Sequence, residues 1–309
     1  MHDDCPNIEQ FYFNGAEQLF GQLGDTDEPD RISDTKLKAL SVEGSTTRNS
    51  EQIGYSEGSS LSYLLAKKNC HCNVIVDGTA LYREKCQSFY VGSIKFSIIG
   101  PEKAALQDLK SDWEDKLNER RIKPKIISKA YYEAFEQYAK NLQGSVKNVV
   151  PITSSEETCI ESLSKVNFED DNSLPNKSSL SFLIESNGKR LLYLSDCDAK
   201  MVTSWLDDLE LKNIEVDAVK ISHHGSKNNT SLELLKRIVC NKYLISTNGK
   251  SHGHPDLEVL ARIAVVNKSS GAEIFLNYEV EHIPDWFMTD LENNYPNIIL
   301  SMNSCEVVL

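Results

Sequence analysis

The sequence predicts an α/β fold, in which strands and helices alternate along most of the chain. Short runs rich in β-branched and aromatic residues, such as 181–185 and 242–247, are typical of strands. Apolar residues that recur every three or four positions, as over 106–117, are typical of one face of a helix. The turn at Asn187–Gly188 joins two strand-like runs and predicts a β-hairpin. Alternation of these patterns over 309 residues favours the α/β class.

The first hundred residues contain short elements separated by polar loops at 25–36 and 44–51. We expect a strand over 8–13, helices over 16–23, 34–42 and 61–68, a strand over 73–76, and a hairpin with strands at 89–92 and 94–99.

The pattern changes after Gly100–Pro101. Leu106, Leu109, Trp113 and Leu117 form a helical stripe that Pro124 ends, and a second helix is expected over 130–143. Its stripe is Tyr131, Phe135, Tyr138 and Leu142. Residues 144–175 are rich in Ser, Asn and acidic side chains and predict a loop. We therefore interpret 102–173 as a helical insertion, whose aromatic stripe serves either packing or, as a minor alternative, ligand binding.

The last third returns to alternating elements. We expect a hairpin over 180–196, helices over 200–211, 230–240 and 255–266, strands over 216–222, 242–247 and 273–278, and closing strands at 298–300 and 307–309.

Composition limits the functional classes. The net charge of −13 argues against nonspecific nucleic-acid binding by a broad basic face, although bound metal ions would invert the field of an acidic site. The sequence contains no run of 18 or more apolar residues, so no membrane-spanning helix is predicted. The first residues do not resemble a signal peptide. The eight cysteines are scattered, which favours free thiols in the cytoplasm over a disulfide framework. Cys70-His71-Cys72 lacks a matching second pair and is a weak zinc candidate.

The most distinctive stretch is Val219 to Lys227, a short apolar strand followed by His223-His224-Gly225-Ser226. Adjacent histidines at a strand end suggest a site, because imidazole is the commonest metal ligand near neutral pH. The alternative is a polar loop with two solvated histidines.

Further segments with polar side chains next to predicted strands surround this stretch in the sequence. They are Asn176-Lys177-Ser178-Ser179-Leu180, the strand 190–194 ending at Ser195-Asp196, the strand 243–247, and His252-Gly253-His254-Pro255. In this order the segments resemble the second half of a metallo-β-lactamase-fold hydrolase, in particular the branch with the hydrolase domain of competence DNA-uptake proteins and its stand-alone bacterial relatives. The resemblance is close over 174–265 and loose over 8–100. It implies an αββα sandwich built of two similar halves.

The resemblance also implies roles for individual residues. Asp196 stands where the family has an aspartate that bridges two metal ions, and Asp198 is a nearby alternative. The structural alternative for Asp196 is a helix N-cap. His223 corresponds to a late metal ligand, and His224 is either a second ligand or a substrate contact.

The remaining candidates lie around the substrate. His254 resembles a late histidine that donates a proton or contacts phosphate, whereas His252 is favoured as a solvated loop residue. Gly225 and Ser226 would let a substrate oxygen approach the backbone. Asn176 and Ser178 resemble a motif that supports the site.

The family has metal ligands in a His-x-His-x-Asp-His motif in the first half of the fold, and this motif has no counterpart here. His2-Asp3-Asp4 resembles it only weakly. We therefore divide the chain into a remnant of the first half over 1–101, the insertion over 102–173, and a second half over 174–309. Two Zn²⁺ or Mn²⁺ ions are expected only if the missing ligands are supplied, because Asp196 and His223 alone are too few.

Two functions follow. The first is a metal-dependent hydrolase that, in its complete form with the missing ligands supplied, acts on phosphodiesters or nucleic acid. The second is a non-catalytic, truncated or degenerate module of the same fold that binds a protein partner through 102–143. Hydrolysis of a β-lactam or thioester is a weaker third possibility, which the His-His-Gly-Ser context disfavours.

Overall fold

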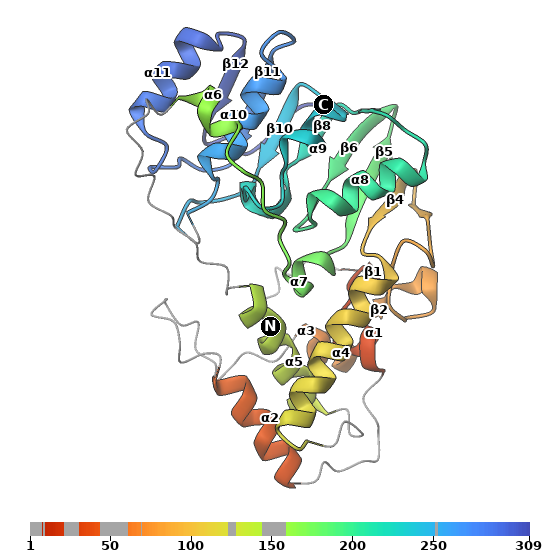
Figure 1. Ribbon diagram of the computed structural model, residues 1–309. Helices are drawn as coiled ribbons and strands as arrows, with labels where there is room; N and C mark the ends of the chain where they lie inside the picture. Colours follow the sequence, from red (N-terminus) through yellow and green to blue (C-terminus); the bar gives the residue numbers. More distant parts are fainter. Residues whose placement is uncertain are drawn as a thin grey trace. The chain divides into compact units, whose positions relative to one another are not determined.

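The computed structural model describes residues 8, 10–21, 31–43, 61–68, 70–122, 128–143, 159–250 and 253–309 (Figure 1). The chain forms two compact units that interleave along the sequence. The first unit comprises Met1–Cys86, Glu102–Val146 and Ser173–Ser178, and the second comprises Gln87–Pro101, Lys147–Asn172 and Ser179–Leu309.

The second unit is built on a mixed sheet of eight strands in the order β12-β11-β10-β8-β6-β5-β4-β3. Its strands are β3 (Ser88–Val91), β4 (Ile94–Gly100), β5 (Ser181–Ser186), β6 (Lys189–Tyr193), β8 (Ala218–Lys220), β10 (Lys242–Ile245), β11 (Ala272–Leu276) and β12 (Ile298–Ser301). Neighbours from β3 to β6 are antiparallel, and those from β6 to β12 are parallel. This sheet and its helices confirm the α/β class.

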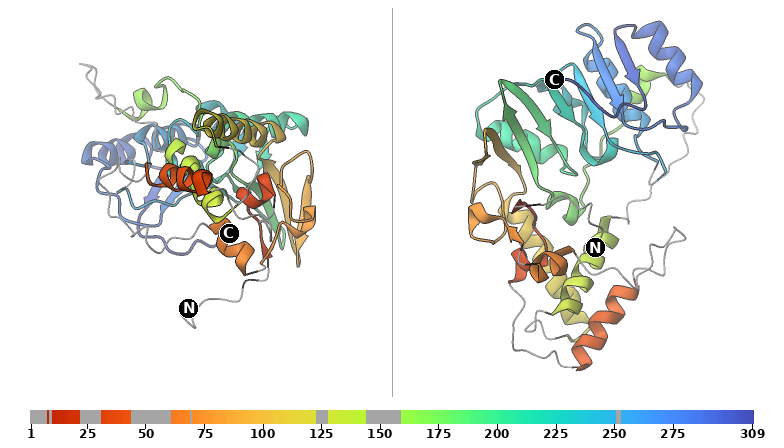
Figure 2. Two further views of the ribbon diagram at one scale, coloured as in Figure 1. Left: turned by 90° about the horizontal axis from the view of Figure 1, so that it is seen from below. Right: turned by 180° about the vertical axis from the view of Figure 1, so that it is seen from behind.

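Helices connect the parallel strands and cover one face of the sheet (Figure 2). They are α8 (Ala199–Asp208), α9 (Leu232–Lys236), α10 (Leu257–Val266) and α11 (Asp285–Asn294), with α6 (Ile160–Ser164) packed beside α10. All four connections advance in the same direction along the sheet, and right-handed crossovers therefore place these helices on a single face. A small parallel sheet of β7 (Ile214–Glu215) and β9 (Ile238–Val239) and the short η2 (Ser222–Gly225) complete the unit.

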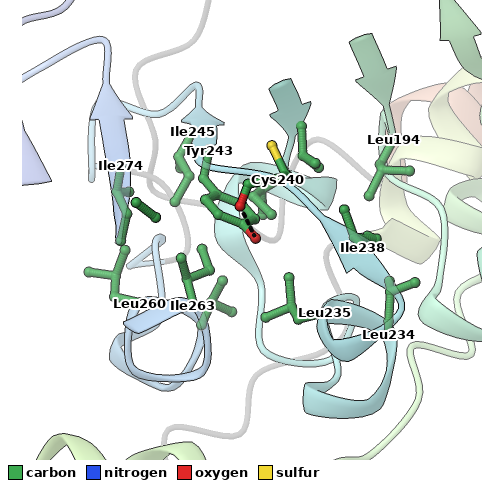
Figure 3. Packing of buried hydrophobic residues seen from close by; sticks show 14 of the residues in the cluster. Leu194, Leu234, Leu235, Ile238, Cys240, Tyr243, Ile245, Leu260, Ile263 and Ile274 are labelled. Carbon is green, nitrogen blue, oxygen red and sulfur yellow. Dashed lines mark hydrogen bonds between the residues drawn. The ribbon is translucent and has the colours of Figure 1, made fainter. Parts of the chain in front are cut away.

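Alternate residues of the parallel strands point into the core under the helices. Tyr243 and Ile274 are almost fully buried, and Leu260 and Ile263 of α10 pack against them (Figure 3). The opposite face of the sheet carries both apolar and charged side chains. Lys220 and Lys242 lie on it beside partly buried apolar side chains, which are Phe96, Phe182, Ile184, Leu191, Leu244 and Phe275.

The first unit is mainly helical. Its elements are β1 (Gln10–Phe11), α1 (Ala16–Phe20), α2 (Arg31–Glu43), α3 (Leu61–Lys67), β2 (His71–Cys72), η1 (Val74–Val76), α4 (Lys103–Glu119), α5 (Lys129–Gln143) and α7 (Leu174–Lys177). The stripes of α4 and α5 face each other, and the Trp113 ring lies 5.7 Å from the rings of Tyr131 and Phe135. The predicted stripe over 102–143 is therefore packing.

Several expected elements are different in the structure. The predicted strand 73–76 is a 3₁₀ turn, because Asn73 has a left-handed backbone (φ 47°) and its side-chain amide hydrogen-bonds Phe13 and Thr79. The predicted helix 230–240 ends at Lys236, and Ile238–Val239 instead pairs with β7.

Other differences concern short or terminal segments. The predicted strand 8–13 is reduced to β1, and the predicted loop 144–175 contains α6 and α7. The tail 307–309 has no regular structure, although the Lys242 ammonium donates to the Val308 carbonyl. In the part of the chain that the structure describes, no helix is long and apolar enough to cross a membrane.

Candidate functional site

The candidate site lies where the adjacent parallel strands β6, β8 and β10 end. Their carboxyl ends share one edge of the sheet, where sites of α/β proteins are commonly built. The chain after β8 carries His223 and His224, and the chain after β10 leads to His254. The ring centroid of His223 lies 6.1 Å from that of His224 and 5.5 Å from that of His254. We call these three side chains the histidine rim.

A left-handed turn presents the first two rings. His223 (φ 43°), His224 (φ 56°) and Gly225 (φ 87°) all have positive φ, which is uncommon outside glycine. A Cβ on Gly225 would lie 2.6 Å from Pro255 Cβ, and the Asp256 amide donates to the Gly225 carbonyl at 2.9 Å. Glycine is therefore required for the close contact between the loop of His223 and the loop of His254.

His223 is held by hydrogen bonds from both its backbone and its ring. Its amide donates to the Ser195 carbonyl at 2.8 Å, and its Nδ1 lies 3.2 Å from Asn229 Oδ1 and 3.6 Å from Asp171 Oδ2. Burial by itself lowers the pKa of His223, but the carboxylates of Asp171 and Asp196 outweigh burial, so the pKa is raised. His223 is thus more readily protonated than an ordinary histidine.

The other two rings are also engaged through Nδ1. His224 Nδ1 donates to the Ser246 carbonyl, and His254 Nδ1 lies 3.4 Å from Asp256 Oδ2. The Asp256 carboxylate accepts the Lys227 amide at 2.7 Å. Burial raises the pKa of Asp256, but His254 and the Lys227 amide lower it more, so the pKa lies below the usual range. His224, hydrogen-bonded through Nδ1, would act on a ligand through Nε2, and the Asp256 carboxylate beside His254 Nδ1 favours the same arrangement there.

Asp196 and Asp198 have different roles. Asp198 Oδ1 accepts the Met201 amide at 2.7 Å, so Asp198 is the N-cap of α8 and Asp196 is not. Asp196 follows β6, and its carbonyl accepts Asn229 Nδ2 at 3.1 Å. Since the same amide contacts His223, the turn of Asp196 and the histidine rim are joined through one side chain.

The predicted metal ligands do not form a complete set on their own. Within the described ranges, no group of three or more His, Cys, Asp or Glu side chains is arranged to hold a metal ion. A catalytic metal site needs at least three protein ligands. The described residues therefore do not fit a resident metal without ligands from elsewhere.

The remaining predicted residues have other surroundings. Ser226 is buried, and its hydroxyl accepts the Asn228 amide at 3.3 Å. Asn176 is buried in α7, which belongs to the first unit, and its supporting role stays a prediction. His252 and His2-Asp3-Asp4 lie outside the described residues.

Sequence patterns did not identify four residues that support the rim, namely Asp171, Asn229, Asp256 and His282. Asp171 is 5% exposed and comes from a segment predicted to be an unstructured loop. His282 Nε2 donates to the Pro255 carbonyl at 3.1 Å, beside His254. Asp256 directly follows His254-Pro255 in the sequence, and this position could have identified it as a partner of His254.

Comparisons of the chain with family models, with curated proteins and with solved structures found no match.

Proposed function

We propose that this chain is a metal-dependent hydrolase of the metallo-β-lactamase fold that acts on phosphodiesters, and that the histidine rim binds the phosphodiester. The observation that carries the proposal is the rim itself. Three imidazoles from two loops gather at the carboxyl ends of the parallel strands β6, β8 and β10, each with Nδ1 facing a protein oxygen. Their fixed orientation favours action through Nε2 on a common ligand.

Phosphodiester oxygens suit such a site chemically. A protonated imidazole donates a charge-assisted hydrogen bond to an anionic oxygen, and a neutral imidazole accepts a proton from water or returns one to a leaving group. We assign phosphate contact and proton transfer to His224 and His254, with Ser226 as a further contact.

The sheet supports the fold part of the proposal. Its face opposite the helices carries apolar side chains such as Phe182, Leu244 and Phe275 that are only partly buried. A sheet with apolar side chains on both faces buries more of them when a layer covers each face. In an αββα sandwich that second layer is another sheet. Free thiols at all seven described cysteines support a reduced, cytoplasmic setting.

Metal dependence rests on the chemistry of the donors. Asp196 and His223 would each supply a ligand to Zn²⁺ or Mn²⁺, and the metal would polarise a phosphoryl oxygen and activate water. Since the described residues do not complete a ligand set, we derive no step through the metal.

That incomplete set favours a second candidate, a non-catalytic module of the same fold. Partner binding through 102–143 would then use the polar faces of α4 and α5, because Trp113 and Phe135 are buried between the helices.

Turnover and metal content separate the candidates. We expect the purified chain, supplied with Mn²⁺ or Zn²⁺, to hydrolyse bis(4-nitrophenyl) phosphate and to hold fewer than two metal ions per chain by elemental analysis. His223→Ala should abolish turnover, whereas His71→Ala, which removes an exposed histidine of the first unit, should leave it unchanged.

Three other outcomes would contradict parts of the proposal. Turnover that survives in His223→Ala removes His223 from the site. Two tightly held ions show that the ligand set is complete. Absence of both turnover and phosphodiester binding in the unaltered chain rejects the hydrolase and leaves the binding module.

A further inference from the structure

We propose that Asn229, oriented by the buried carboxylate of Asp171, fixes the proton of neutral His223 on Nδ1, so that Nε2 is the nitrogen that acts on the ligand. The inference deepens the proposed function and, as a statement about catalysis, rests on it. Neither residue reaches the substrate side of the ring, and both are therefore positioning residues. The tautomer itself is independent of the reaction.

The orientation of the Asn229 side-chain amide is fixed by the atoms around it. Its Nδ2 faces three oxygens that can only accept: Asp171 Oδ2 at 3.0 Å, the Asp196 carbonyl at 3.1 Å and the Cys197 carbonyl at 3.3 Å. Rotating the amide by half a turn would set its oxygen against these acceptors. The amide nitrogen is therefore fixed on this side, and Oδ1 must face the other way.

Oδ1 then determines the tautomer of the ring. It lies 3.2 Å from His223 Nδ1, and an amide oxygen has no proton to donate. A hydrogen bond at this distance requires the proton on Nδ1. Asp171 Oδ2, 3.6 Å from the same nitrogen, adds a negative charge that favours the same arrangement.

Asp171 is itself held in place. Its amide donates to the Asn228 carbonyl at 3.0 Å, so the segment before it is joined to the loop of Asn229. Arg262, 1% exposed, donates to the Val166 carbonyl at 3.2 Å and lies 5.6 Å from the Phe168 ring. Arg262 also donates to the Lys227 and Thr230 carbonyls, both at 2.8 Å, on either side of Asn229. One buried guanidinium thus aligns the two segments that carry Asp171 and Asn229.

The consequence concerns the direction in which His223 acts. With its proton on Nδ1, neutral His223 carries the lone pair on Nε2, where it can accept a proton or bind a cation. Supporting groups of this kind fix the tautomer and ring orientation of functional histidines, and their loss costs about 10–100-fold in activity or metal affinity.

The test is a long-range ¹H–¹⁵N NMR spectrum of the full chain labelled at histidine nitrogens, recorded without metal or substrate at a pH where the rings are neutral. His223 should show a protonated Nδ1 and an unprotonated Nε2. Asn229→Leu should shift both nitrogens toward the values of a tautomer mixture. Asn228→Ala, which truncates the neighbouring asparagine, should leave the His223 signals unchanged.

Steady-state kinetics test whether the positioning of His223 by Asn229 matters for the reaction. Asn229→Leu should lower kcat for bis(4-nitrophenyl) phosphate about 10–100-fold with KM little changed, because orientation and not binding is lost. Asn228→Ala should match the unaltered chain. A kcat equal in both variants overturns the positioning role.

The two proposals fail in different ways. A His223 protonated on Nε2 in the unaltered chain overturns the inference, even if Asn229→Leu does not fold. An unchanged tautomer in folded Asn229→Leu overturns it as well. The expected tautomer in a chain without turnover or phosphodiester binding rejects the proposed function and leaves the assignment of the proton standing.

Discussion

The aromatic rings of the first unit and the imidazole rings of the second unit differ in what surrounds them. The Trp113 ring packs edge to face against the rings of Tyr131 and Phe135, and burial raises the pKa of the Tyr131 phenol. The rings of His223 and His254 instead meet carboxylates and an amide. Apolar surroundings make a ring a structural element, whereas oriented polar partners prepare a ring for chemistry.

The two environments predict different consequences of mutation. Removing a ring from the first unit should affect stability. Removing one from the rim should affect binding or turnover, because none of its three rings belongs to the hydrophobic core of the second unit.

Trp113→Ala should have the largest effect on stability. The side chain is 0% exposed at the centre of the α4–α5 packing, and such truncations cost about 3–5 kcal/mol. Thermal unfolding followed by circular dichroism should detect the loss. NMR signals of His223 and His254 should change little, because these residues belong to the other unit.

Tyr90→Ala is the matched control, because this aromatic side chain of β3 is 65% exposed. Its effect should be within about 0.5 kcal/mol. Equal losses in the two variants would show that the stripe of the first unit is not a core.

Gly225→Ala should come next and should affect the second unit. An L-residue in the left-handed region costs roughly 1–2 kcal/mol, and overpacking against Pro255 adds about 1–3 kcal/mol. Urea unfolding monitored in the second unit should show the loss, together with shifted His223 and His254 signals.

Gly188→Ala separates the two causes, since Gly188 has a similar φ of +75° but no heavy atom within 4 Å of an added Cβ. It should cost only the backbone strain. If both alanine variants lose the same stability, the contact between the two loops of the rim is not tight.

The smallest effect should be a pH dependence caused by Asp256, which faces His254, Lys227 and Arg262. Its pKa is lowered in the folded state, because His254 and the Lys227 amide outweigh burial. A lowered pKa stabilises the fold above the unfolded value of about 3.9, and this contribution disappears as the pH falls through the folded pKa.

Asp256→Asn should therefore be less stable than the unaltered chain at about pH 6. This gap in the free energy of unfolding should become smaller at about pH 3. Urea midpoints at both pH values measure the gap. A gap that widens in acid would contradict the sign of the shift.

Periodicity and turn signals identified much of the fold from the sequence. The stripe Leu106 to Leu117 and the Asn187–Gly188 turn correspond to α4 and to the β5–β6 hairpin. Local signals failed where a single polar side chain redirected the backbone, as at Asn73, and where pairing with a distant strand ended a helix, as at Ile238–Val239. The helix α11 was also missed.

The sequence by itself determined that strands ending in Asp196, His223 and the His254 loop would follow one another in an α/β chain, because local residue patterns specify strands and turns. Only the tertiary structure decided that Asp171 lies behind His223 and that Asn229 joins it to the turn of Asp196. Asp171 precedes Asn229 by 58 positions, and local propensity carries no information about a contact across that separation. It depends on packing around Arg262, which the whole second unit creates.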